Sequence, residues 1–291
     1  MTRIDEGVPL SGFTTIGTGG PAAAFARPRT LAELEQALGW AGERGLAVVT
    51  VGLGSNLLAA DAGVEALVLR LEGELAGTGT EGELLVAGGG APNAVCLHRA
   101  RSAGLGGFEF ASAIPGTVGG GVRMNAGAYG SDWSEILVRA FVVTTGGSGW
   151  LTPRELGLSY RHSELRHGQV VARVELRLTP RPEAEIRALV ADLQTKRKAT
   201  QPTNRRTFGS VFKNPPHELG AGAMLEACGL KGYRVGGAVI SPRHANFIEN
   251  AGGATTADCL AVMREARRRA RERFGVDLVH EVELLGPLDP P

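Results

Sequence analysis

The chain has 291 residues, of which 43% are hydrophobic and 21% charged, and its 31 Lys and Arg residues nearly balance its 30 Asp and Glu residues. This length allows more than one core, and the composition is that of an ordinary folded protein rather than a disordered chain. The balanced charge disfavours nucleic acid as a partner. The unusual excess is in glycine, with 43 residues, several of them clustered between apolar runs. Such clusters indicate places where the backbone closely approaches a ligand or another part of the chain.

The N-terminal segment and the cysteines bear on location and metal binding. Residues 1–17 lack the apolar core of a signal peptide, and no apolar run is long enough to span a membrane. We therefore expect a cytoplasmic protein with no membrane partner. Cys96, Cys228 and Cys259 lie far apart without CxxC spacing, which disfavours both disulfides and a zinc site. We expect no metal and three buried free thiols.

The first third of the chain alternates predicted helices and strands. Thr30 and Glu33 form a capping box before a helix of apolar periodicity that ends at Gly45. The next predicted elements are strands at 47–51, 64–71 and 84–87 and a helix at 92–103. Strand, helix, strand order predicts an α/β fold.

The middle of the chain continues with strands and a long helix. Strands are predicted at 136–145 and 170–178, and a helix at 182–198. Thr152 to Glu155 form a second capping box with Pro153 at the first helical position, which indicates the start of a further helix. The polar, proline-containing stretch after residue 198 indicates a domain boundary near residue 205.

The last third is predicted to contain a short helix at 221–228, a turn and strand in GGAVISPRHANFI, and a final helix. Leu260 to Phe274 carry the apolar stripe of that helix, whose other face is rich in arginine. Acidic residues interleave with the arginines, so a solvated face is favoured over a nucleic-acid interface. A strand over 276–285, containing Glu281 and Glu283, closes the chain.

Two glycine-rich loops suggest a bound anion. GLGSNLL at 52–58 follows a strand, as a phosphate loop does, but it matches neither GxxxxGK[ST] nor GxGxxG, and a tight turn explains it equally well. IPGTVGG at 114–120 and NAGAYG at 125–130 offer further backbone donors. Because a kinase-type lysine is missing, a dinucleotide lying across both loops is favoured over a hydrolysed triphosphate.

Two polar residues, Ser210 and Arg161, are candidates for a chemical role. Ser210 lies in GSVFKNP at 209–215, where a turn or helix-cap serine is commoner than a catalytic one. Arg161 lies in YRHS and reads either as a carboxylate fork or as a surface cation, which is the commoner case. Neither GxSxG nor the spacing of the six histidines indicates a hydrolase triad or a metal cluster.

Taken in order, GLGSNLL, IPGTVGG with NAGAYG, YRHS, GSVFKNP, HANFI and EVELLG resemble the family of UDP-N-acetylenolpyruvoylglucosamine reductases over nearly the whole chain. The resemblance implies an α/β (α+β) protein with the vanillyl alcohol oxidase type of FAD-binding fold. It implies FAD-binding subdomains at 1–72 and 73–205 and a substrate-binding domain at 206–276, with the strand at 277–291 returning to the 73–205 subdomain.

The same resemblance implies the chemistry. Noncovalent FAD, reduced by NADPH, would pass hydride to C3 of the enolpyruvyl group of the sugar nucleotide, leaving negative charge at C2 and on its carboxylate. Arg161 and Glu281 would bind and polarise that carboxylate. Ser210 would protonate C2, since a hydroxyl donates without bringing a charge into the pocket. The product would be UDP-N-acetylmuramate, a peptidoglycan precursor.

The matching positions also imply ligand contacts. The pyrophosphate of FAD would contact Gly52, Gly54, Ser55, Asn56 and Leu57, and its ring and phosphates Ala111, Ser112, Ile114, Pro115, Gly116, Thr117 and Val118, with Asn125 and Ala126 nearby. The substrate would contact Tyr160, Lys213, Asn214, His244 and Asn246.

Some positions depart from the family pattern. Thr14-Thr15 replaces the usual Asn-Thr, Leu53 stands where glycine is common, and Gly121 stands where alanine is usual. After Arg161 there is no room for the tyrosine-bearing loop of longer members, so the chain resembles the shorter subclass. We expect a monomer. Two alternatives remain: a flavin oxidase of the same fold that uses oxygen, and a nucleotide-binding protein without catalysis.

Overall fold

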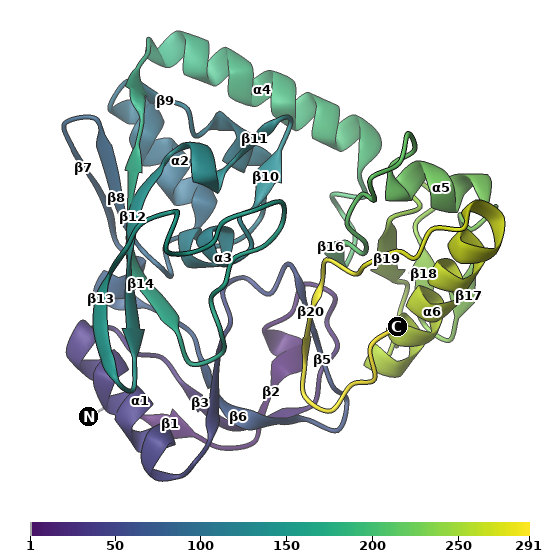
Figure 1. The fold of residues 1–291 in the computed structure, drawn as a ribbon, viewed down its shortest axis with the longest axis horizontal. Helices are drawn as coiled ribbons and strands as arrows, with labels where there is room; N and C mark the ends of the chain where they lie inside the picture. The colour runs from purple at the N-terminus through teal and green to yellow at the C-terminus, as the bar shows by residue number, and fades with distance from the viewer. Residues whose placement is uncertain (1) are drawn as a thin grey trace. The chain divides into compact units, whose positions relative to one another are not determined.

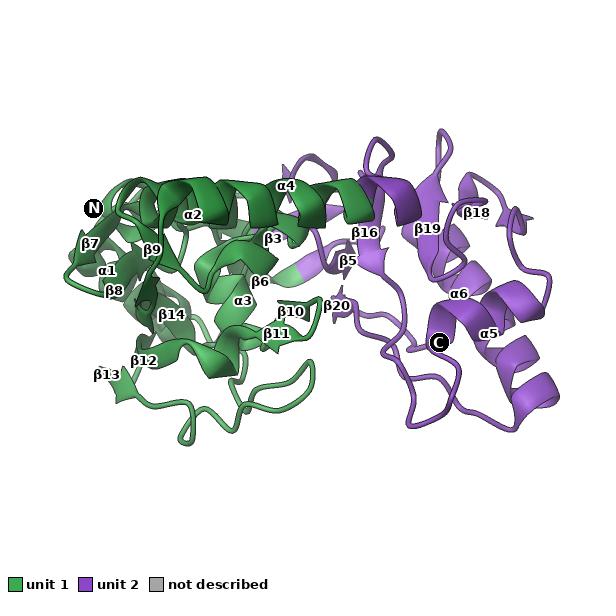
Figure 2. Ribbon diagram, turned by 90° about the horizontal axis from the view of Figure 1, so that it is seen from above, with its two compact units in different colours: residues 1–6, 24–53, 65–197 green, residues 7–23, 54–64, 198–291 purple. Residues whose placement is uncertain are grey.

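The computed structural model describes residues 2–291, which divide into two compact units (Figure 2). Unit 1 comprises the N-terminal residues to Glu6, Ala24–Leu53 and Glu65–Arg197. Unit 2 comprises Gly7–Ala23, Gly54–Val64 and Lys198–Pro291. Each unit is therefore assembled from three separate stretches of the chain.

The first sheet of unit 1 has the strand order β1-β3-β6-β4, and its β4 and β6 are parallel. Its elements are β1 (Ile4–Asp5), β3 (Pro21–Ala26), β4 (Ala47–Thr50), β6 (Val64–Leu69) and the connecting helix α1 (Leu31–Glu43). As predicted, α1 begins after Thr30, whose side chain accepts a hydrogen bond from Glu33 N. Leu34 and Leu38 of α1 pack in a core with Leu67 and Leu69 of β6.

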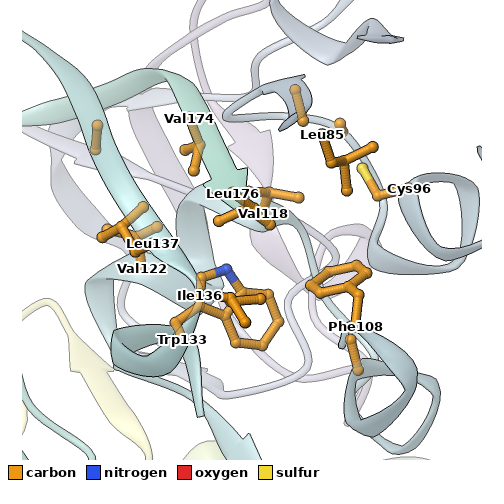
Figure 3. Close-up of a cluster of buried hydrophobic side chains, with 14 of the residues drawn as sticks. Leu85, Cys96, Phe108, Val118, Val122, Trp133, Ile136, Leu137, Val174 and Leu176 are labelled. Carbon is orange, nitrogen blue, oxygen red and sulfur yellow. The ribbon is translucent and has the colours of Figure 1, made fainter. Parts of the chain in front are cut away.

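The second sheet of unit 1 is antiparallel, with the order β13-β12-β14-β8-β7 (Figure 1). Its strands are β7 (Thr78–Glu81), β8 (Leu84–Gly88), β12 (Leu137–Thr144), β13 (Gly147–Leu151) and β14 (Val170–Arg177). Helices α2 (Asn93–Ser102) and α3 (Val118–Arg123) contribute to the core of this region. In that core the rings of Trp133 and Phe108 pack edge to face, with their centroids 5.4 Å apart (Figure 3). Most predicted strands and helices of this region are thus confirmed.

Smaller elements complete unit 1. They are the strand pairs β9 (Leu105–Gly106) with β15 (Thr179–Pro180) and β10 (Gly127–Ala128) with β11 (Ser131–Asp132), the long helix α4 (Glu183–Thr200), whose last three residues fall in unit 2, and the 3₁₀ helices η2 (Gly73–Ala76), η3 (Glu109–Ala113) and η4 (Trp133–Glu135).

The predicted helix at Pro153 is wrong. The capping contacts do form, because Glu155 N donates to Thr152 Oγ1 and Thr152 N to the Glu155 carboxylate. The chain nevertheless makes only turns from 153 to 157. Gly157 adopts φ 58°, a left-handed conformation that ends a helix, while Leu156 turns inward and is buried.

Unit 2 is built on an antiparallel sheet of order β16-β19-β18-β17. Its elements are η1 (Leu10–Gly12), β2 (Val8–Pro9), β5 (Leu57–Ala59), β16 (Thr207–Ser210), α5 (Ala221–Ala227), β17 (Arg234–Val235), β18 (Ala238–Ile240), β19 (Phe247–Asn250), α6 (Thr256–Phe274) and β20 (Glu283–Leu285). Helix α6 starts with a complete Thr255/Asp258 capping box and ends at Gly275 with φ 68°. Its predicted apolar stripe is buried in one core with α5 and the sheet.

The C-terminal strand corrects two expectations. The predicted strand over 276–285 is only β20, so Glu281 precedes it. The segment 277–291 was expected to return to residues 73–205. Instead β20 pairs in parallel with β5, inside unit 2 (Figure 1). The other expected domain limits stay a prediction.

Two of the three cysteines are buried. Cys96 and Cys259 are buried free thiols, and burial raises their pKa values to about 11 and about 12, respectively. Cys228 is only half-buried, contrary to expectation.

Within residues 2–291, no helix has the length and apolar character needed to cross a membrane. In that same range no three His, Cys, Asp or Glu side chains cluster as a metal site would require.

Candidate active site

Arg161 lies at the tip of a tight turn in unit 1. Ser159 and His162 exchange backbone hydrogen bonds in both directions at 3.1 Å, which leaves Tyr160 and Arg161 as the two central residues. Arg161 has φ 51°, a conformation that normally favours glycine or asparagine and costs a larger residue about 1–3 kcal/mol. Such strain persists only where the surroundings fix it.

The loop at 123–127 supplies those surroundings. Arg161 Nη2 donates to Gly127 O at 2.5 Å, and Ser163 Oγ donates to Arg123 O at 2.5 Å. A Cβ at Gly127 would lie 2.9 Å from Arg161 Nη1 and 2.6 Å from Ser131 O. The backbone contact with Ser131 O therefore requires glycine at position 127, and the guanidinium lies close beside it.

Asn125, expected to contact the cofactor, is only 1% exposed. Its Nδ2 donates to Ser159 O and its Oδ1 accepts from Ser134 N, both at 2.9 Å. The side chain therefore holds the Arg161 turn from inside the protein. The neighbouring Ala126 is partly buried, and its backbone bonds to Gly121 O and Trp133 N.

The segment 111–118 is held against the beginning of α2. Asn93, which is 2% exposed, donates from Nδ2 to Ile114 O at 3.0 Å and from its backbone to Gly116 O at 3.0 Å. Ala111 is buried, Pro115 is exposed, and Thr117 caps the N-terminus of α3. The segment is thus a fixed loop rather than a flexible linker.

One feature of unit 1, the hydroxyl of Ser112, fits a polar ligand at this segment. The Oγ of Ser112 is buried and makes no hydrogen bond within the described structure, a condition that usually means a missing partner. A Cβ at Gly52 would lie 2.6 Å from the Oγ1 of Thr117, so the backbone at 52 sits directly against the loop. These residues fit the FAD implied by the sequence.

In unit 2, Gly54 and Asn56 have structural roles. Gly54 has φ 67°, and a Cβ there would lie 1.9 Å from Phe13 O, so glycine is required. Thr15 Oγ1 lies 3.1 Å from Gly54 O and 2.6 Å from Thr207 O, a link that sequence reasoning missed. Asn56 Nδ2 donates to Glu281 O at 3.1 Å. Ser55 is half-buried, and Leu57 begins β5.

Ser210 ends β16, after Gly209 with φ 83°. The next residues pair with the C-terminal segment: Glu281 N donates to Val211 O at 2.8 Å and Lys213 N to Val279 O at 2.9 Å. The residue after Ser210, Val211, therefore accepts a hydrogen bond from the backbone of Glu281. Ser210 and Glu281 are 71 positions apart in the chain. Unit 2 brings both residues to one place.

Three further predicted substrate residues lie around this pairing. Asn246 is 4% exposed and clamps Phe212, accepting from its N at 3.0 Å and donating to its O at 2.8 Å. Asn214 Oδ1 accepts from Ala221 N at 3.0 Å, at the start of α5. His244 Nδ1 accepts from Asn246 N, and burial, aided by the charge of Lys231, lowers the pKa of His244.

The predicted site residues thus form two groups. Unit 1 holds the group around Arg161 and Tyr160 together with the 111–118 loop and Gly52, and unit 2 holds Ser210, Glu281 and their neighbours. The catalytic roles of Arg161, Ser210 and Glu281 and the convergence of Arg161 with the other two stay predictions. The sequence carries no signal for the structural role of Asn125 and Asn246, because each bonds to backbone atoms of a residue 34 positions away.

Two protein families match separate parts of this chain. Residues 22–150 match the FAD binding domain family, and residues 201–285 match the family described as UDP-N-acetylenolpyruvoylglucosamine reductase, C-terminal domain. This confirms the expected FAD-binding fold, and the order of the two matches agrees with the order of the motifs.

Individual relatives agree with these families. A UDP-N-acetylenolpyruvoylglucosamine reductase of Anaeromyxobacter dehalogenans is 47% identical over 282 residues, covering 97% of this chain and 85% of the relative. One from Rubrobacter xylanophilus is 44% identical, covering 98% and 95%. The crystal structure of the enzyme of that name from Thermus caldophilus superposes with a TM-score of 0.85 at 38% identity, covering 98% of this chain and 100% of that one.

Proposed function

This chain belongs to the UDP-N-acetylenolpyruvoylglucosamine reductase family of FAD-dependent oxidoreductases, and from that premise we propose the reaction it catalyses. It reduces the enolpyruvyl ether of UDP-N-acetylglucosamine to UDP-N-acetylmuramate, with NADPH as the reductant. The product is a precursor of peptidoglycan. The reaction adds hydride to C3 and a proton to C2 of the enolpyruvyl group.

FAD would be held noncovalently by the 111–118 loop and the backbone at Gly52 and Gly54. The buried, unpartnered Oγ of Ser112 in that loop supports this assignment. A bound FAD would supply the hydride-transfer chemistry between NADPH and the enolpyruvyl double bond. The protein must then neutralise the negative charge that this leaves on the substrate.

Ser210 supplies the proton. The observation that carries this role is the pairing of residues 211–213 with 279–281, because it sets Ser210 beside the backbone of Glu281. A hydroxyl donates to C2 without adding a charge to the pocket, and it is then reprotonated from solvent. Lys213, three residues on, favours the transient oxyanion electrostatically.

Arg161 and Glu281 bind and polarise the substrate carboxylate. A guanidinium presents parallel donors that match two carboxylate oxygens. Its left-handed backbone supports this role, since a merely solvated arginine gains nothing from strain. Tyr160, Asn214 and His244 are proposed substrate contacts because they occupy matching positions in the motifs of the family.

The test measures the two half-reactions, flavin reduction and flavin reoxidation, separately in the Ser210→Ala variant. The variant should keep its flavin and be reduced by NADPH at the normal rate. Reoxidation by the enolpyruvyl sugar nucleotide should slow about 10²–10⁴-fold, the usual contribution of a placed proton donor. Stopped-flow absorbance of the flavin follows both steps.

Ser241→Ala is the matched control, because Ser241 is a buried serine of the same unit whose Oγ accepts only from Arg243 N within the described structure. It should leave both half-reactions unchanged. Normal turnover of Ser210→Ala would remove Ser210 from the mechanism. Rapid reoxidation of the reduced wild type by air, without turnover of the sugar nucleotide, would instead identify an oxidase.

A further inference from the structure

Two buried asparagines each hold the backbone next to a proposed catalytic residue. Asn125 is 1% exposed and Asn246 is 4% exposed. The sequence alone suggests that both contact a ligand, yet the amide of each is engaged with protein backbone. At such burial, little surface remains for a ligand, so a different role must explain them.

Asn125 joins the first residue of the Arg161 turn to a separate loop. Its Nδ2 bonds to Ser159 O and its Oδ1 to Ser134 N, each at 2.9 Å. Ser159 is the residue whose backbone closes the turn with His162. Fixing Ser159 therefore fixes the direction in which the residue two positions later, Arg161, leaves the backbone.

This turn needs such fixing. In residues 2–291, the non-glycine residues with positive φ are Asn125 (38°), Tyr129 (55°) and Arg161 (51°). Arg161 lies in the turn, Asn125 lies in the loop that holds it, and Tyr129 follows that loop between β10 and β11. Each such residue costs free energy that neighbouring contacts must offset. Without the Asn125 bond, the turn can relax toward unstrained conformations that move the guanidinium.

Asn246 acts in the same way on the segment after Ser210. It accepts from Phe212 N, donates to Phe212 O, and receives a backbone bond from Val211 N at 2.9 Å. The pairing of β16 with β19 is irregular between Thr207 and Ser210. Ser210 itself pairs with Phe247 of β19, so the side-chain clamp two residues later acts together with this irregular ladder in holding Ser210.

We propose that Asn125 and Asn246 are positioning residues, the first for the Arg161 guanidinium and the second for the Ser210 hydroxyl. Neither touches the substrate. Asn125 sets how well the substrate carboxylate is bound, and Asn246 sets how fast C2 is protonated. This inference rests on the proposed function.

The experiment compares Asn125→Ala with Asn246→Ala in the flavin-loaded protein. Calorimetry measures affinity for UDP-N-acetylmuramate, which carries the carboxylate, and for UDP-N-acetylglucosamine, which does not. Stopped flow measures flavin reoxidation by the enolpyruvyl substrate in H₂O and D₂O. Because residue type and burial match, each variant is the control for the other.

Asn125→Ala should lose on the order of 10-fold or more in affinity for UDP-N-acetylmuramate, the effect of a displaced group, with affinity for UDP-N-acetylglucosamine unchanged. Asn246→Ala should keep both affinities. It should slow reoxidation by about 10-fold or more, with a larger solvent isotope effect, because proton transfer becomes the slow step.

Equal changes in both variants, or no change in either, would overturn the inference. Arg161→Ala and Ser210→Ala are measured alongside: if these do not show the carboxylate effect and the isotope effect, the proposed function fails instead. If an alanine variant does not fold, Ser163→Ala loosens the Arg161 turn through its bond to Arg123 O, and Asn246→Ser keeps part of the clamp. Both must then show the same pattern in weaker form.

Discussion

The backbone of Gly121 lies directly against the indole ring of Trp133. A Cβ at residue 121 would lie 2.5 Å from both Cε2 and Cζ2 of Trp133, a ring that is completely buried between Phe108 and Phe110. Alanine is usual at this position in the family that the sequence resembles. The structure indicates instead that Gly121 is matched to Trp133.

Gly121→Ala should therefore lower the free energy of unfolding by about 1–2 kcal/mol. Overpacking against a fixed ring costs about 1–3 kcal/mol, and the better helix propensity of alanine offsets at most about 1 kcal/mol. Urea denaturation measures the difference. Gly120→Ala is the control, because it lies in the same helix and its Cβ would meet Thr117 Oγ1 at an ordinary 3.5 Å. It should be neutral or slightly stabilising; equal losses in both variants would contradict the pairing.

Arg161→Asn separates the backbone strain of the turn from its chemistry. Asparagine tolerates the left-handed conformation, so stability should stay within about 1 kcal/mol of wild type while turnover of the enolpyruvyl substrate collapses. Arg161→Val, with a branched side chain at φ 51°, should lose turnover and also about 1–3 kcal/mol of stability. Thermal and urea unfolding distinguish the two variants, and identical stabilities would argue against strain at this residue.

His244 should make unit 2 less stable in mild acid. Burial, the largest cause, and Lys231 lower its pKa below the ordinary 6.5. Below pH 6.5 the unfolded chain binds a proton that the folded chain does not, so the free energy of unfolding falls, by at most about 1.4 kcal/mol per pH unit. Above pH 7.5 this contribution vanishes.

His244→Asn keeps an acceptor near Asn246 N and removes the titration. Its unfolding free energy should therefore fall less steeply than that of wild type between pH 6.5 and pH 5. Urea denaturation at four pH values measures both slopes. Parallel curves would show that another group causes the acid sensitivity.

Thr15→Val should weaken the link between the 54–57 loop and β16. The Thr15 hydroxyl has one hydrogen, and Thr207 O at 2.6 Å is its nearer acceptor. Losing this bond should cost about 0.5–1.5 kcal/mol of unfolding free energy. Thr15→Ser retains the hydroxyl and should lose clearly less, as urea denaturation would measure. If the two variants were equally stable, the hydroxyl would not be the link.

Local patterns in the sequence predicted most of the fold because the responsible interactions are local. The capping residue Thr30 and the apolar stripe of α6 specify their helices within a few positions of the chain. The failures have a different origin. Thr152 and Glu155 form their capping contacts, but Gly157 ends the turn, and β20 finds its partner more than 220 residues away.

The site was predicted by residue type but not by role. Arg161, Ser210 and Glu281 were singled out through motif order, and the structure joins two of them in unit 2. Asn56, Asn125 and Asn246 look like ligand contacts in a sequence, since an amide can bind either a ligand or a backbone. Only the folded chain shows that each has a backbone partner.

The pairing of β20 with β5 has a consequence for biosynthesis. Unit 1 ends at Arg197, so all of its chain is synthesised before the longest stretch of unit 2, Lys198–Pro291. Unit 2 receives the strand Glu283–Leu285 more than 220 residues after its partner, Leu57–Ala59, has been synthesised. Until then Leu57–Ala59 lacks the neighbour that covers it, and nascent chains stalled before residue 283 should be cut by protease in this half while the other half is already protected.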